Sequence, residues 1–193
     1  ILLYGKPGSG KTEFAKTLAK KSGLKTYIFK NESEVSGSNS STNTLCRLNC
    51  LLSMKSENCM YIIDEAEGLL NSKNINFFGM PVPSATKGIV NKMLEESQNK
   101  TIWIVNFTSQ MDESTLRRFT YSYKFESMPQ SQLRKIAHTK LSPLALDEKT
   151  NSQILELFDT YRVTGSSVDN IVKAIKSLGY DTGKNEELVG CVK

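Results

Sequence analysis

One stretch near the start of the chain constrains its fold more than any other. Residues Gly5 to Thr12 read G-K-P-G-S-G-K-T and fit the phosphate-loop pattern G-x-x-x-x-G-K-[ST] at every fixed position. An apolar run, residues 1–4, precedes the stretch, and apolar residues at helical spacing follow it. A phosphate cradle requires this order of strand, turn and helix, because free N–H groups and the positive end of the helix dipole then face the anion. The alternative, a chance glycine-rich turn, does not account for this placement.

Each residue type in this phosphate loop suits contact with a nucleotide. The glycines allow backbone conformations that turn consecutive N–H groups inward. Lys11 carries a positive charge for the β- and γ-phosphates, and the Thr12 hydroxyl is the expected magnesium ligand. The residues expected to bind nucleotide are Gly5, Lys6, Pro7, Gly8, Ser9, Gly10, Lys11, Thr12 and Glu13.

A second apolar run ends in carboxylates. Residues 60–67 read M-Y-I-I-D-E-A-E, which is the form of a Walker B segment. The continuous apolar character predicts a strand buried on both faces, as in a parallel sheet with helices on each side. Ligands bind at the carboxyl edge of such sheets, so Asp64 can reach the magnesium ion and Glu65 can polarise a water molecule. The alternative is an acidic strand end on the surface.

Two further segments could complete a hydrolytic site. Asn106 lies near the end of the apolar strand 101–107, where its amide could hold an attacking water; a capping or turn role is the alternative. Leu116 to Phe119 contains the adjacent pair Arg117 and Arg118. Adjacent arginines on a helix point in different directions, so we expect only one of them to serve a given site. A surface salt bridge, worth about 0–1 kcal/mol, is the alternative role.

The pattern of expected elements changes after Pro129. Strands disappear, and helical stretches follow over residues 133–141, 154–161 and 168–178. We therefore expect an α/β core over residues 1–128, a small helical domain over residues 129–182 and a tail over residues 183–193. The connection 69–85 contains Phe77 and Phe78 and two prolines; it could contact a partner or fold back on its own domain.

Composition limits the class of protein. The 193 residues include 38% hydrophobic and 23% charged residues, as in ordinary soluble globular proteins, and no apolar run is long enough to span a membrane. We expect a cytoplasmic protein without a membrane partner, and, because Ile1 already belongs to the first strand, a fragment of a longer chain. Four cysteines without a C-x-x-C pair and one histidine predict no zinc site. The net charge of +5 is compatible with nucleic-acid binding, but the lysines are scattered.

Taken together, these elements resemble the AAA+ ATPase module, and its classical AAA branch most closely, over essentially the whole chain. The matching segments are Gly5 to Thr12 (Walker A), Ile62 to Glu65 (Walker B), Asn106 (sensor 1), Leu116 to Phe119 (arginine finger), Leu133 to Lys140 (first lid helix) and Thr164 to Val168 (the turn before the last lid helices). In that branch the histidine of the first lid helix, here His138, commonly lies beside the adenosine. A core or capping histidine is the alternative reading of His138.

The resemblance implies a P-loop α/β fold: a five-stranded parallel sheet flanked by helices, with Walker A and Walker B on neighbouring central strands, followed by a small all-α lid domain. It also implies an ATPase that binds ATP and Mg²⁺ and hydrolyses the β–γ phosphoanhydride, with Lys11, Glu65 and Asn106 as catalytic residues. In a homo-oligomeric ring, commonly of six subunits, Arg118, with Arg117 as the second choice, would act on the ATP of the next subunit. Turnover would be coupled to remodelling of an unidentified macromolecular partner.

Three departures from the family pattern bear on function. The loop 31–41 lacks the aromatic residue that peptide-threading members place in their pore, residues 166–170 contain no sensor 2 arginine, and the arginine pair lacks the usual Pro-Gly insertion. Two other functions also stay open: a nucleotide-gated adaptor or scaffold with little turnover, and a loader-type ATPase that acts on nucleic acid.

Overall fold

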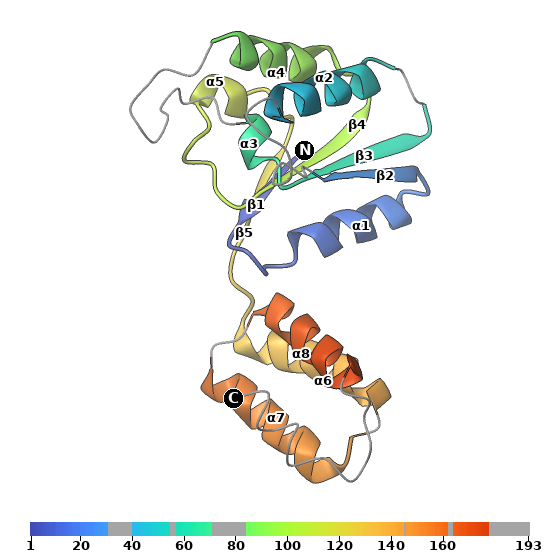
Figure 1. Cartoon of the computed structure of the whole chain (residues 1–193), viewed down its shortest axis with the longest axis vertical. Helices are drawn as coiled ribbons and strands as arrows, with labels where there is room; N and C mark the ends of the chain where they lie inside the picture. The colour runs from blue at the N-terminus through green and yellow to red at the C-terminus, as the bar shows by residue number, and fades with distance from the viewer. Residues whose placement is uncertain (31–39, 55–56, 71–83, 145, 162–163, 178–193) are drawn as a thin grey trace. The chain divides into compact units, whose positions relative to one another are not determined.

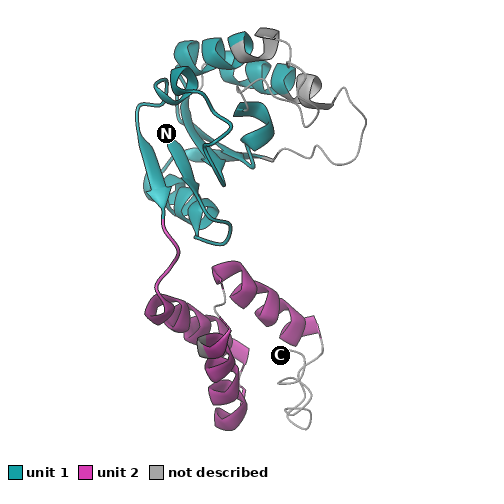
Figure 2. Ribbon diagram, turned by 90° about the vertical axis from the view of Figure 1, so that its left-hand side faces the viewer, with its two compact units in different colours: residues 1–125 teal, residues 126–193 magenta. Residues whose placement is uncertain are grey.

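The computed structural model describes residues 1–30, 40–54, 57–70, 84–144, 146–161 and 164–177. These residues form two compact units, residues 1–125 and residues 126–193, which Figure 2 colours separately. The division after Phe125 precedes the boundary that we expected near Met128. The Phe77–Phe78 connection, most of the loop 31–41 and the tail 183–193 lie outside the described residues.

The first unit contains a five-stranded sheet in which every neighbouring pair is parallel. Its strands are β1 (Leu2–Gly5), β2 (Lys25–Lys30), β3 (Cys59–Asp64), β4 (Lys100–Val105) and β5 (Ser122–Phe125), in the order β2-β3-β4-β1-β5. The expected five-stranded parallel sheet is thus confirmed. The expectation that the Walker A and Walker B strands are neighbours is wrong, because β4 lies between β1 and β3 and hydrogen-bonds to both.

Helices cover both faces of this sheet. They are α1 (Lys11–Lys21), α2 (Ser40–Ser53), α3 (Glu67–Leu70), α4 (Ser84–Glu96) and α5 (Glu113–Leu116). Successive residues of β3 point to opposite faces. Ile62 packs with Ala15 and Ala19 of α1, whereas Ile63 belongs to the core that includes Leu48 of α2 and Val90 of α4. Figure 1 shows α1 on one face and α2 and α4 on the other. The continuous apolar run of β3 is therefore buried on both faces, as its sequence predicted.

The second unit is helical. Its described residues include α6 (Gln130–Leu141), the 3₁₀ turn η1 (Ser142–Leu144), α7 (Glu148–Thr160) and α8 (Gly165–Ser177). Its core contains residues from all three α-helices: Ala137, Leu141, Ile154, Phe158, Val168 and Ile175. Lys140 of α6 forms an ion pair with Asp169 of α8. The N-cap of α7 is Asp147, whose carboxylate accepts the Thr150 N–H at 2.8 Å.

Candidate nucleotide-binding site

Three sheet positions bring the expected site residues together. Strands β3, β4 and β1 are adjacent, and parallel pairing places their carboxyl ends at one edge of the sheet. Asp64 ends β3, Asn106 follows β4, and Gly5 ends β1 and begins the phosphate loop. Residues far apart in the chain therefore meet at this edge.

Gly5 is at a position that only glycine can occupy without strain. Its φ angle is 142°, and a Cβ atom there would lie 2.2 Å from the backbone oxygen of Phe125 on the neighbouring strand β5. At the other end of the loop, Gly10 has φ 91° and is the N-cap of α1, without a side-chain hydrogen bond to the first helical turn. This leaves N–H groups of that turn available for an anionic ligand.

Lys11 lies inside the loop. Its side chain is buried, with only 6% of the residue exposed, and its Nζ donates to the carbonyl oxygens of Gly5 at 2.7 Å and Lys6 at 3.0 Å. A third bond, of 3.0 Å, goes to Oδ1 of Asn106. Burial lowers the pKa of the Lys11 ammonium, and the carboxylates of Glu67 and Asp64 oppose that shift. A buried cation that is held by neutral oxygens suits an anionic group brought close to it.

Ser9 provides an independent test of whether a phosphate fits here. Only 5% of the residue is exposed, and its hydroxyl oxygen has no hydrogen-bond partner among the described residues. An unsatisfied buried hydroxyl costs free energy and is explained when a ligand supplies the missing partner. The loop thus combines free N–H groups, a buried ammonium and an unsatisfied hydroxyl, which together fit the oxygens of a phosphate.

Thr12 and Asp64 form the candidate magnesium site. The Thr12 hydroxyl donates to Oδ2 of Asp64 at 3.0 Å, so the two expected ligands already lie within hydrogen-bond distance. Hydroxyl and carboxylate oxygens are the ligands that Mg²⁺ accepts beside phosphates. The donor set therefore fits a magnesium ion bound together with a nucleotide.

Glu65 lies on a strained turn directly after β3. It is exposed and adopts a left-handed backbone, φ 55°, a conformation that costs a non-glycine residue about 1–3 kcal/mol. Two bonds hold the turn: Glu65 N–H donates to Oδ1 of Asp64 at 3.1 Å, and Ala66 N–H donates to the Ile104 carbonyl of β4 at 3.0 Å. The chain therefore turns away from β3 immediately after Asp64, the last residue of that strand.

Glu67 is a site residue that the sequence reasoning did not single out. Its Oε1 accepts the backbone N–H of Asn106 at 2.5 Å, across 39 positions of sequence. A signal was present, since the Walker B segment contains a third carboxylate beyond Asp64 and Glu65. Nothing in the local sequence pattern indicated which hydrogen-bond donor that carboxylate would contact.

The two arginines are held by acids of their own unit. Arg117 pairs with Glu113, and its side chain is 74% exposed. Arg118 is 25% exposed; its Nε lies 2.8 Å from Oε1 of Glu95, and its Nη1 donates to the Ser114 carbonyl. Both arginines thus form an ion pair within their own chain.

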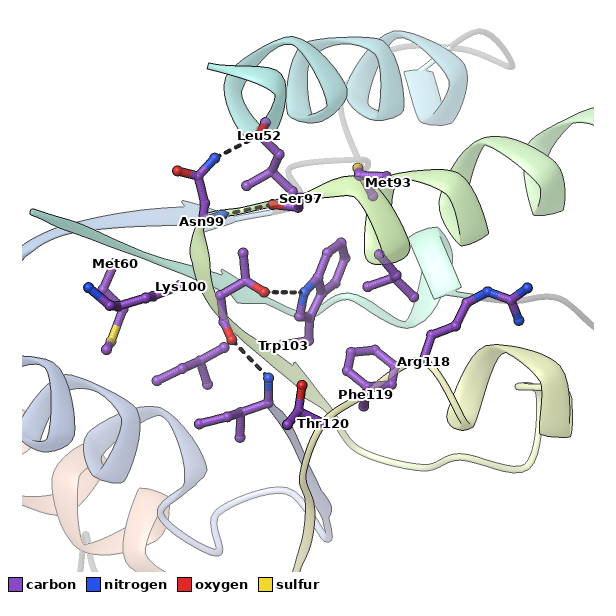
Figure 3. Close-up of a pocket in the computed structure, with 14 residues that line it drawn as sticks. Leu52, Met60, Met93, Ser97, Asn99, Lys100, Trp103, Arg118, Phe119 and Thr120 are labelled. Atoms are coloured by element: carbon purple, nitrogen blue, oxygen red, sulfur yellow. Dashed lines mark hydrogen bonds between the residues drawn. The ribbon is translucent and has the colours of Figure 1, made fainter. Parts of the chain in front are cut away.

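Arg118 also borders a pocket next to Phe119 and the buried Trp103 (Figure 3). The lining of this pocket includes Ile1 and Lys100, at the amino ends of β1 and β4. Arg118 therefore lies toward the sheet edge opposite the phosphate loop of its own chain.

Comparison with known proteins identifies the family of this chain. The family described as "ATPase family associated with various cellular activities (AAA)" has a model that matches residues 1–127. The chain belongs to the AAA family. Its expected resemblance to an AAA+ ATPase module is confirmed.

A solved structure agrees with the fold of this AAA protein. The crystal structure of the FIGL-1 AAA domain in complex with ADP matches 100% of this chain and 71% of that chain, with a TM-score of 0.63 and 17% sequence identity. At that identity the match shows the shared fold. No curated protein sequence matches the chain. Among the described residues, no helix of this AAA protein is long and apolar enough to cross a membrane.

The remaining expected site residue of the AAA chain, His138, belongs to the helical unit. It is exposed on α6, where it borders a pocket with Arg134, Lys135 and Leu155. Its exposure argues against a role as a core histidine. A place beside adenosine stays a prediction.

Proposed function

We propose that this AAA protein binds Mg-ATP at residues 5–13 and hydrolyses the β–γ phosphoanhydride bond. The observation that carries the proposal is the pair of hydrogen bonds that join Lys11 to Asn106 and Thr12 to Asp64, at the end of three adjacent strands. The FIGL-1 structure holds ADP, and the unsatisfied Ser9 hydroxyl supports a phosphate ligand here as well.

Different residues of the chain have different roles in the proposed hydrolysis. A magnesium ion bound by Thr12 and Asp64 would neutralise charge on the phosphates. Lys11 adds its positive charge where negative charge develops on the γ-phosphate. Glu65, exposed beyond the end of β3, accepts a proton from the attacking water, and the amide of Asn106 orients that water.

An arginine completes the site from a neighbouring subunit. Because Arg118 lies toward the opposite edge of its own sheet, neither arginine of the pair is expected to act on the nucleotide of its own chain. Sequence reasoning favoured Arg118. The contacts now favour Arg117, since among the described residues its more exposed side chain pairs with an exposed acid, whereas Arg118 contacts Glu95 and a backbone carbonyl. We infer a ring of identical subunits in which Arg117 reaches across and Arg118 anchors α5.

Coupling to a macromolecular partner is the broadest part of the proposal. Loss of the γ-phosphate removes contacts that favour one arrangement of a nucleotide-binding protein, and such two-state changes can perform mechanical work. We propose that turnover remodels a macromolecular partner. The family membership of the chain supports this role.

The decisive experiment compares the wild type with Glu65→Gln. We expect the variant to bind a fluorescent ATP analogue with unchanged affinity but to release phosphate at the background rate. Glu96→Gln, an exposed acid on α4, is the matched control and should behave as the wild type. Phosphate release per subunit should rise with protein concentration if a neighbour supplies the arginine.

Two results would contradict the proposal. If the wild type binds ATP but releases phosphate no faster than background at every protein concentration, the protein is a nucleotide-gated adaptor. If it fails to bind ATP at all, the phosphate loop is not a functional site.

A further inference from the structure

Glu67 connects two strand ends of the proposed hydrolytic site. It is the first residue of α3, half-buried, and its carboxylate reaches across to β4, where Oε1 accepts the Asn106 N–H at 2.5 Å. Asn106 is the first residue after β4 and has no further strand pairing to hold it. The carboxylate of Glu67 therefore holds the backbone at the point where β4 ends.

The contact continues from Asn106 into the phosphate loop. The Oδ1 atom of Asn106 accepts from Lys11 Nζ at 3.0 Å, and the same Nζ donates to the carbonyls of Gly5 and Lys6. A line of hydrogen bonds thus runs from Glu67 through Asn106 and Lys11 to the loop. A shift of the Asn106 backbone would move its amide relative to the ammonium.

The same region also holds Glu65 in place. Ala66, which is fully buried, donates its N–H to the Ile104 carbonyl, two residues before the Glu67 contact at Asn106. The turn after β3 is therefore joined to β4 at two points, and the strained residue Glu65 precedes both. Loss of the Glu67 contact leaves one of these points.

We propose that Glu67 is a positioning residue, which holds Asn106 and the turn bearing Glu65 in register with Lys11 by accepting the Asn106 N–H. Glu67 acts through these residues and not on the substrate. The inference rests on the proposed hydrolysis of ATP at this site.

The first test separates turnover from binding. We expect Glu67→Ala to lower kcat about 10–100-fold, because displacements of about 1 Å in a catalytic group have costs of this order. The KM for ATP and the affinity for a fluorescent ADP analogue should change less than about threefold, since the phosphate loop itself is intact. Glu67→Gln retains an acceptor oxygen at the same distance along the side chain and should restore most of kcat. Glu96→Ala, an exposed acid on α4, is the control for loss of an acidic side chain.

The second test reads the contact without turnover. Amide hydrogen exchange of Asn106, followed by nuclear magnetic resonance, should be faster in Glu67→Ala than in the wild type and close to the wild type in Glu67→Gln. The fluorescence of Trp103, which is buried in the same unit, reports whether each variant is folded under the assay conditions. Rates are then compared per folded molecule.

The outcomes distinguish the inference from the function on which it rests. A Glu67→Ala protein with wild-type kcat, or with unchanged exchange at Asn106, overturns the positioning role. A Glu67→Gln protein as slow as Glu67→Ala also overturns it, because the charge and not the acceptor would then matter. A wild type without turnover overturns the proposed hydrolysis, and the exchange of Asn106 still decides whether Glu67 holds the end of β4.

Discussion

Three glycines of the first unit make a graded test of the structure. Each is replaced by alanine, which adds only a Cβ atom. Gly5 combines a positive φ of 142° with a Cβ position 2.2 Å from the Phe125 carbonyl oxygen. Gly23, after α1, has φ 68° and no atom within 4 Å of the added Cβ, and Gly88, inside α4, has neither a positive φ nor a close atom. The series therefore separates backbone strain from collision.

The expected changes in the free energy of unfolding follow from these differences. Gly88→Ala should stabilise the unit by about 0.5–1 kcal/mol, the difference in helix propensity. Gly23→Ala should destabilise it by roughly 1–2 kcal/mol, the cost of a left-handed conformation for an L-residue. Gly5→Ala adds a collision with backbone atoms, which no side-chain rotation relieves, so β5 must move and weaken its pairing with β1. The sum of strain, about 1–3 kcal/mol, and a lost hydrogen bond, about 0.5–1.5 kcal/mol, is about 1.5–4.5 kcal/mol.

The assay is urea unfolding followed by tryptophan fluorescence. Trp103 is the single tryptophan of the chain, is 1% exposed and lies beside Phe119, with ring centroids 6.3 Å apart. Its emission therefore reports the first unit alone, so unfolding of the second unit does not contribute to the measured urea transition. A loss of about 1.5–4.5 kcal/mol is a large part of the roughly 5–15 kcal/mol of a typical domain.

The order of the free energies of unfolding of the three variants tests whether β5 lies close to Gly5. If Gly5→Ala costs no more than Gly23→Ala, the close approach of β5 to the start of the phosphate loop is refuted. The variant has a functional consequence as well, because the carbonyl of Gly5 accepts a hydrogen bond from Lys11. We expect ATP affinity to fall in Gly5→Ala and to stay unchanged in Gly23→Ala.

Three further predictions concern single side chains. Arg117→Ala should abolish most turnover while changing the free energy of unfolding by less than about 0.5 kcal/mol, whereas Arg118→Ala should chiefly lower the free energy of unfolding; phosphate release and Trp103 fluorescence check both. Asn99→Ala should cost about 1–3 kcal/mol in urea unfolding, because its amide donates to two carbonyls at the end of α2, at 2.7 and 3.0 Å. Asp147→Ala should lower the melting temperature of the helical unit at pH 7, followed by circular dichroism. Hydrogen bonds from Thr150 hold the pKa of Asp147 below its ordinary value of 3.8, so its stabilisation is complete above pH 3.8 and the difference between variant and wild type should shrink as pH falls below that value.

Local patterns in the chain were sufficient to predict a strand buried on both faces and the phosphate loop. The unbroken apolar run of β3 predicted burial on both faces, and Ile62 and Ile63 do pack on opposite sides. The glycine pattern predicted a turn with positive φ angles, which Gly5, Gly8 and Gly10 adopt. These predictions succeed because strand burial and turn conformation depend on residues close together in the sequence.

The order of the strands was beyond such patterns. Sequence reasoning placed the Walker A and Walker B strands side by side, but β4 separates them and presents Asn106 between Gly5 and Asp64. Which parallel strands pair is decided by the packing of the connecting helices over the whole unit. The consequence is functional, because Asn106 can then contact Lys11 directly.

The sequence by itself determined that this chain has a phosphate loop, an acidic strand end, a polar strand end and a helical C-terminal part. These follow from residue types at short, regular spacings, and the AAA family model matches residues 1–127, which contain the first three. Only the tertiary structure decided which groups come into contact. The Glu67 carboxylate meets the Asn106 backbone, Arg118 meets Glu95, and the Phe125 carbonyl lies against Gly5. Such contacts join residues far apart in the chain, and their partners depend on how the backbone folds in three dimensions.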